Sequence, residues 1–224
     1  MATIVLLLLL DFGVRGPSLA AVKSVLIREG MTAQEINDLL ITEDVLREGE
    51  VIPSSSEGYL LPDTYEFYLF STAEVVLARF KENFDKKAAP LLAESNEYET
   101  LILASLLEKE VITLEDKRLV AGILLERLRR NEALHVDATI CYVKPLPCHP
   151  ILKKDFEIDS LYNTYMYKGL PPTPIANPGI ESITASSDPL ESNFLFYITH
   201  PETKRAIFAT TLDEHNVNVF KYLK

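Results

Sequence analysis

Residues 100–130 read TLILASLLEKEVITLEDKRLVAGILLERLRR, and this stretch decides the helical part of the fold. Its leucine and alanine content favours a helix over residues 98–110. A second helix is predicted to begin at the capping box Thr113-x-x-Asp116 and to continue past residue 128, with Val120 and Ile123 on its inward face. Because only a short break separates them, we expect these helices to pack as an antiparallel pair.

A small α+β unit is predicted upstream of this pair. The sequence KSVLIREGMTAQEINDLL (residues 23–40) combines a β-type run, a turn at Gly30 and the capping box Thr32-x-x-Glu35. The stretch VIPSSSEG (residues 51–58) is the best linker candidate, since proline and a serine cluster interrupt regular structure. We therefore expect one unit over residues 1–54 and a second over residues 55–224, the latter continuing with a helix capped by Ser71-x-x-Glu74.

The last third of the chain alternates rigid loops with a hairpin. Two runs, FLFYIT (residues 194–199) and AIFATT (residues 206–211), flank the turn HPETKR and are predicted to pair as strands. The box Thr211-x-x-Glu214 then starts a final helix. The whole pattern predicts an α+β protein: a small α+β subdomain followed by a mixed helical and β domain.

Composition excludes some classes of function. The 224 residues include 33 acidic and 22 basic side chains, a formal charge of −11. A nucleic acid is therefore excluded as the main partner, because phosphate backbones are bound by concentrated Lys and Arg. The usual phosphate-loop and metalloprotease motifs are missing from the sequence, so we predict no cofactor and no metal. A neutral or amphoteric substrate fits this composition better.

The two cysteines leave several states open. Cys141 and Cys148 can pair across a short loop or remain two free buried thiols, and the second state is the default expectation. His135 and His149 lie nearby, but the spacing H-x5-C-x6-C-H matches no usual zinc-ligand pattern.

Seven apolar residues, 4–10, precede Asp11. This run is far shorter than a spanning helix and has no basic segment before it. We expect a buried strand or helix, or the remnant of a longer N-terminal segment. Composition alone leaves the localisation open.

Two glutamates on the first helix are candidates for acid–base chemistry. Both Glu108 and Glu110 have apolar neighbours on a helix, and spacing alone does not choose between them. Glu108 has the small residues Ala104 and Ser105 one turn back, which leaves room for a ligand. A carboxyl between apolar walls gains the raised pKa that a general acid needs near neutral pH. The alternative is a surface glutamate paired with a neighbouring lysine or arginine.

The stretch YNTYMYKGLPPTPIANPG (residues 162–179) has the chemistry of a sugar-binding loop. Its prolines fix the backbone, its tyrosines offer faces for stacking, and Asn163, Thr164 and Asn177 offer neutral hydrogen bonds. The alternative is a rigid structural loop. In EGYLLPDTYEF (residues 57–67), Asp63 either orients a ligand or forms a turn after Pro62.

Five motifs occur here in the order typical of a known family: EGYLLPDTYEF, ASLLEKE (104–110), YNTY (162–165), GLPPTPIANPG (169–179) and EHNVNV (214–219). Over residues 23–224 the chain resembles the YceG-like (MltG) endolytic murein transglycosylases. The resemblance implies that Glu108, rather than Glu110, is catalytic. It also implies that residues 23–46 form a LysM-like, glycan-binding module.

The implied reaction is non-hydrolytic cleavage of the MurNAc-β-1,4-GlcNAc bond within peptidoglycan strands, leaving 1,6-anhydro ends. The implied partners are peptidoglycan and the cell-wall synthesis machinery. The implied location is the bacterial cell envelope at the outer face of the cytoplasmic membrane, with membrane association only if a longer N-terminus carries an anchor. The expected substrate-binding residues are Glu57, Tyr59, Asp63, Tyr65, Asp137, Thr139, Asn163, Tyr165, Asn177, His215 and Asn216.

The chain departs from the family pattern beside Asp137. His135 and Ala138 replace a glutamine and a proline that the family usually has, while Asp137 and Thr139 are kept. Two other functions therefore stay open. One is a catalytically weakened glycan-binding or scaffold relative. The other is a hydrolase that uses Glu108 with Asp137 or Asp63, which would leave reducing ends instead of anhydro ends.

Overall fold

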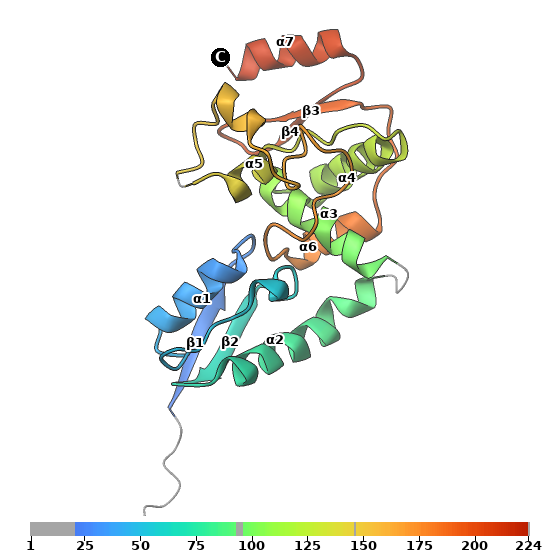
Figure 1. Ribbon diagram of the computed structural model, residues 1–224. Coiled ribbons are helices and arrows are strands. Elements are labelled where there is room, and N and C mark those ends of the chain that lie inside the picture. The colour runs from blue at the N-terminus through green and yellow to red at the C-terminus, as the bar shows by residue number, and fades with distance from the viewer. Residues whose placement is uncertain (1–20, 93–95, 146, 224) are drawn as a thin grey trace, which may run out of the picture.

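The computed structural model describes residues 21–92, 96–145 and 147–223, and within them it forms two packed units (Figure 1). The apolar run at residues 4–10 lies outside the described residues. Three short 3-10 helices, η1 Ser54–Ser56, η2 Ala89–Leu91 and η3 Lys153–Glu157, lie in the connections. Mixed helices and antiparallel strands confirm the predicted α+β class.

The first unit contains β1 Val22–Ile27, α1 Ala33–Thr42, β2 Asp63–Tyr68 and α2 Ala73–Lys87. The strands are antiparallel, with Val25 opposite Tyr65, and their alternate residues face a core that reaches Phe80 of α2. The Ser54–Ser56 turn therefore lies inside this unit, which ends after α2 and not near Ser55 as expected. The reason is that β1 gains its pairing strand and most of its apolar cover from residues beyond the turn.

Helix caps follow the predicted boxes with one shift. Thr32 forms a complete capping box with Glu35, and the Thr113 side chain accepts from the Asp116 amide. At α2 the cap is Thr72 and not Ser71, because the Thr72 hydroxyl accepts from the Val75 amide. Ser71 instead donates to the Tyr68 carbonyl.

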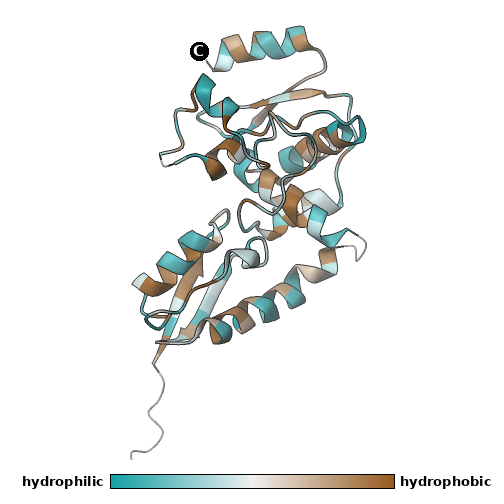
Figure 2. Cartoon of the chain, in the orientation of Figure 1, coloured by the Kyte–Doolittle hydropathy of each residue, from teal (hydrophilic) through white to brown (hydrophobic). Residues whose placement is uncertain are grey.

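The second unit is built around α3 Glu97–Glu110, whose residues from Thr100 to Leu107 are all buried. α4 Leu114–Arg129 and α6 Ile180–Ser187 pack against it and against each other. Figure 2 shows hydrophobic residues along α3 where these helices meet. Gly122 of α4 is required here, since a Cβ at this position would lie 2.2 Å from the Leu190 carbonyl oxygen.

The remaining elements cover the far side of this helical core. They are α5 Asp137–Val143, the hairpin β3 Phe196–Thr199 with β4 Ala206–Ala209, and α7 Leu212–Tyr222. The hairpin and the box at Thr211 agree with the sequence prediction. Among the described residues, the helices are too short or too polar to cross a membrane.

Candidate active site

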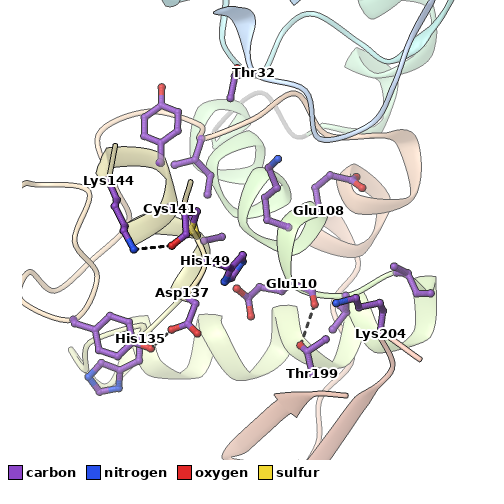
Figure 3. Close-up of a pocket in the computed structure, with 18 of the residues that line it drawn as sticks. Thr32, Glu108, Glu110, His135, Asp137, Cys141, Lys144, His149, Thr199 and Lys204 are labelled. Carbon is purple, nitrogen blue, oxygen red and sulfur yellow. Dashed lines mark hydrogen bonds between the residues drawn. A yellow bond between two sulfur atoms is a disulfide. The ribbon is translucent and has the colours of Figure 1, made fainter. Parts of the chain in front are cut away.

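A cavity of about 1530 Å³ lies between the two units. Thr32, Glu35 and Asp38 line it from the α1 side, with Thr32 labelled in Figure 3, and the opposite wall comes from α3, α5, β3 and α7. Both Glu108 and Glu110 line this cavity. The environments of these two carboxylates differ sharply.

Glu110, the last residue of α3, is the partly buried carboxyl with a shifted protonation equilibrium. Burial raises the pKa of Glu110 to about 7, and the nearby Asp137 carboxylate adds to the rise. Hydrogen bonds oppose it: Tyr197 Oη donates to Oε2 at 3.2 Å, and the Ala138 amide also favours the charged form. The Glu110 backbone is fixed as well, because Thr199 Oγ1 donates to its carbonyl at 3.0 Å (Figure 3). Glu110 therefore exchanges a proton near neutral pH.

Asp137 and Tyr165 form a hydrogen-bonded pair beside Glu110. The Tyr165 hydroxyl donates to Asp137 Oδ1, and both residues line the cavity. Burial raises the pKa of Tyr165 above its ordinary value, and the Asp137 hydrogen bond raises it further, so the phenol keeps its proton. His135, with a φ of 54°, lays its ring 4.9 Å from that of Tyr165. His135 thus packs on this pair.

Arg127 supplies positive charge to the same wall. Its guanidinium donates to the Leu134 carbonyl at 2.6 Å and to the Leu195 carbonyl at 3.1 Å, which holds it in the cavity lining. The positive charge of Arg127 opposes the rise in the pKa of Glu110. His215 of α7 lines the cavity too, with its ring 5.3 Å from Phe196.

Three partners hold the Glu108 carboxylate: the Gly179 amide, the Ser182 hydroxyl and the Lys117 ammonium. Its Oε2 accepts from the Gly179 amide at 3.0 Å and from Ser182 Oγ at 2.6 Å, at the start of α6. Lys117 Nζ lies 3.4 Å away, and the side chains of this ion pair are only 3% and 8% exposed. The N-terminus of α6 stabilises this carboxylate. Through Lys117 of α4 and the start of α6, Glu108 of α3 links these three helices.

Glu57 and Asn177 tie the two units together. Glu57 accepts from the Ala33 amide at the start of α1, 3.0 Å to each oxygen, and from Asn177 Nδ2 at 2.8 Å. Asn177 Oδ1 accepts from the amides of Gly58 and Leu60 at 2.8 and 2.9 Å. Burial raises the pKa of Glu57 to about 7. Glu57 lines the cavity, whereas fully buried Asn177 joins the units from within.

Asn163 and Thr139 are buried inside the second unit. Asn163 Nδ2 donates to two carbonyls of the 156–158 segment, each at 2.9 Å. Thr139 Oγ1 lies 3.0 Å from Thr164 Oγ1 and donates to the Val136 carbonyl at 2.7 Å. These residues brace the loops that carry Tyr165 and Asp137, and their side chains lie outside the cavity lining.

Tyr59, Asp63 and Tyr65 belong to the first unit and also lie outside the cavity lining. Asp63 accepts from Lys87 and from Asn83, and the Lys87 ammonium lowers its pKa. Tyr65 Oη donates to the Leu61 carbonyl at 2.6 Å. Tyr59 packs its ring 5.1 Å from Phe84. Asn216 is exposed on α7.

Cys141 and Cys148 form a disulfide, so the expected pair of free thiols is wrong. The reason is proximity: their Cα atoms lie 5.0 Å apart, within the range that an S–S bond needs. His149 lies close to both sulfur atoms, and these three residues are the one metal-like cluster found among the described residues. Sulfur in an S–S bond lacks the thiolate character that zinc requires.

Sequence reasoning missed two residues that line the cavity around Glu110: Arg127 and Tyr197. Arg127 stands in a basic helix end, and Tyr197 stands in an apolar strand run. Neither context signals a site. The alternation of FLFYIT does place Tyr197 and Thr199 on one face of β3, which is the face that meets Glu110.

Known proteins resemble this chain along most of its length. The model of the YceG-like family matches residues 6–221. An endolytic murein transglycosylase of Bacillus subtilis is 32% identical over 189 residues, 82% of this chain and 52% of the relative. An endolytic murein transglycosylase of Streptococcus pneumoniae is 29% identical over 177 residues, 75% of this chain and 32% of the relative.

A solved structure shares the fold. The crystal structure of a yceG-like protein from Listeria monocytogenes superposes with a TM-score of 0.69 at 28% identity, covering 87% of this chain and 75% of that one. The chain spans about half the length of the Bacillus relative and about a third of the Streptococcus relative. The match over nearly all of its residues shows that this chain belongs to the YceG-like family.

Proposed function

We propose that this chain is an endolytic lytic transglycosylase of peptidoglycan, with Glu110 as its single acid–base group. One observation carries this proposal: the Glu110 carboxyl, partly buried and with a pKa of about 7, lines the large cavity of a YceG-like chain beside Asp137 and Tyr197. Two relatives are named endolytic murein transglycosylases, which supports the choice of substrate.

The proposed chemistry has two steps. Protonated Glu110 donates to the glycosidic oxygen between N-acetylmuramic acid and N-acetylglucosamine as that bond breaks. The resulting carboxylate then accepts the proton of the C6 hydroxyl, whose oxygen attacks the anomeric carbon and closes a 1,6-anhydro ring. Glu110 ends the cycle protonated, and no water is consumed.

Neighbouring groups suit this cycle. The Asp137 carboxylate favours the protonated start of the first step by raising the pKa of Glu110, and its negative charge stabilises the positive charge that develops on the sugar. Tyr197 favours the ionised form of Glu110 that follows. Near neutral pH, Glu110 is therefore present in both its protonated and its ionised form, and the cycle uses both.

Glu108 is assigned a structural role, contrary to the sequence expectation. Its carboxylate is already bound by Lys117, Ser182 and the Gly179 amide, so transferring its proton would break a buried ion pair. Among the described residues Glu110 forms no such ion pair: its carboxylate accepts from the Tyr197 phenol and the Ala138 amide.

The experiment compares two variants on purified peptidoglycan. Glu110→Gln should fold normally and lose cleavage, because an amide neither donates nor accepts the required proton. Glu108→Gln should keep measurable cleavage per folded molecule. The products are analysed by mass spectrometry, and anhydro ends are expected.

Other outcomes separate the alternatives. Reducing ends would identify a hydrolase that uses Glu110 with Asp137. Intact strands that still bind the protein would identify a glycan-binding relative. Loss of cleavage in Glu108→Gln alone would return the catalytic role to Glu108. We further propose a location in the cell envelope, with peptidoglycan strands and the cell-wall synthesis machinery as partners.

A further inference from the structure

The residues that follow α5 return to the cavity and form part of its wall. Cys141 and Lys144 line the cavity from α5 and its end, and Cys148 and His149 line it from the loop of residues 147–150. The mechanism proposed above uses none of these side chains. Their arrangement calls for its own explanation.

Three ties hold the backbone of this loop. The Cys141–Cys148 disulfide joins it to α5, the helix that begins with Asp137. Lys144 Nζ donates to the carbonyl oxygens of Cys148, at 2.7 Å, and Pro150, at 2.8 Å, which flank His149. We call this arrangement of Cys141, Cys148 and Lys144 the clamp.

The clamp is anchored on its other side as well. Lys144 forms an ion pair with Asp155 of η3 at 2.7 Å, and the two side chains are only 14% and 7% exposed. An ion pair so little exposed holds its cation in one place better than a solvated pair does. The Lys144 ammonium is therefore fixed, and it fixes the carbonyls on both sides of His149.

His149 itself is exposed, although its backbone is held on both sides. Figure 3 shows its ring projecting into the cavity, on the side where Glu110 and Asp137 lie. An imidazole offers one donor and one acceptor in its neutral form, and both suit the hydroxyl and amide groups of an N-acetylated sugar. A side chain on a fixed backbone also loses less freedom when a ligand binds.

We propose that His149 is a substrate-binding residue, which hydrogen-bonds the sugar seated against Glu110, and that the Cys141–Cys148 disulfide keeps it in position. This inference rests on the proposed function, since it presupposes a glycan in the cavity. It adds a consequence: glycan affinity depends on the oxidation state of the cysteine pair.

The first experiment measures binding without turnover. Soluble peptidoglycan strands are titrated into Glu110→Gln protein by calorimetry, with and without His149→Ala. Loss of one hydrogen bond should weaken binding about threefold to tenfold. His200→Ala is the matched control, because His200 lies at the β3–β4 turn outside the cavity lining and its loss should leave the affinity unchanged.

The second experiment opens the disulfide in the same two proteins. A phosphine reductant is added until thiol titration counts two free cysteines, and circular dichroism checks that the fold persists. Reduction should weaken glycan binding by the parent protein and have no further effect on His149→Ala. This dependence on His149 distinguishes positioning from a general loosening of the fold. Cys141→Ser with Cys148→Ser should reproduce the reduced state without any reductant.

Two outcomes would overturn the inference: unchanged affinity in His149→Ala, or an equal loss on reduction in the presence and absence of His149. Failure of the proposed function gives a different result. If wild-type protein leaves strands uncut yet His149→Ala still weakens binding, the assignment of His149 stands and the transglycosylase proposal fails.

Discussion

Asp137→Asn tests the electrostatic basis of the proposed acid. The pKa of Glu110 rises from 4.5 to about 7, with burial as the largest cause and the Asp137 carboxylate as the next. Removing that charge while keeping the size of the side chain should lower the pKa of Glu110 by roughly one pH unit, which is less than half of the rise. An acid with a pKa of 7 is about 9% protonated at pH 8, and one with a pKa of 6 is about 1% protonated.

The cleavage rate of Asp137→Asn, relative to its own plateau at low pH, should therefore fall about tenfold more at pH 8 than that of the wild type. The assay is release of soluble fragments from peptidoglycan between pH 5 and pH 9. Tyr197→Phe is the control of opposite sign, because the Tyr197 hydroxyl lowers the pKa of Glu110. Loss of this hydroxyl should move the alkaline limb of the pH–rate profile to higher pH. The reasoning would be refuted if the alkaline limb of the pH–rate profile of Asp137→Asn stayed in place or moved to higher pH.

Three further predictions concern stability and metals. Glu108→Ala should lower the free energy of unfolding by about 3 kcal/mol, because it leaves the buried Lys117 unpaired, and a loss under 1 kcal/mol in urea titration would count against the structural role. Asn177→Ala should cost about 3–5 kcal/mol by the same measurement, since buried Glu57 loses one of its donors and the Gly58 and Leu60 amides lose their acceptor; an unchanged midpoint would contradict this. EDTA should leave cleavage unchanged, and a loss that added zinc restores would show a metal requirement.

The joint between the units also explains why several sequence candidates are not in the cavity. Asn177 satisfies four hydrogen bonds across the joint, to Glu57, Met31, Gly58 and Leu60. A buried amide with all of its bonds made within the protein has none left for a sugar. A loop that contains asparagines can either bind a ligand or form buried hydrogen bonds between two units. Composition alone therefore does not show which of these roles an asparagine has.

The sequence by itself determined the family and many of the elements, although it did not predict α5 or α6. The N-cap residues Thr32, Thr113 and Thr211 start helices where predicted, because a hydroxyl and the amides one turn ahead form a local interaction. The alternation in residues 194–199 and 206–211 likewise specified the hairpin. Short-range rules need no knowledge of the rest of the chain.

Only the tertiary structure decided which glutamate of EKE faces the proposed chemistry. Glu108 and Glu110 are two residues apart, so a helix points them about 200° away from each other. The Glu108 carboxylate contacts Lys117 and the start of α6, whereas the Glu110 carboxylate lies near Asp137 and accepts a hydrogen bond from Tyr197. Protonation is set by desolvation and by charges brought close from distant parts of the chain, and the spacing of residues along one helix carries no information about either.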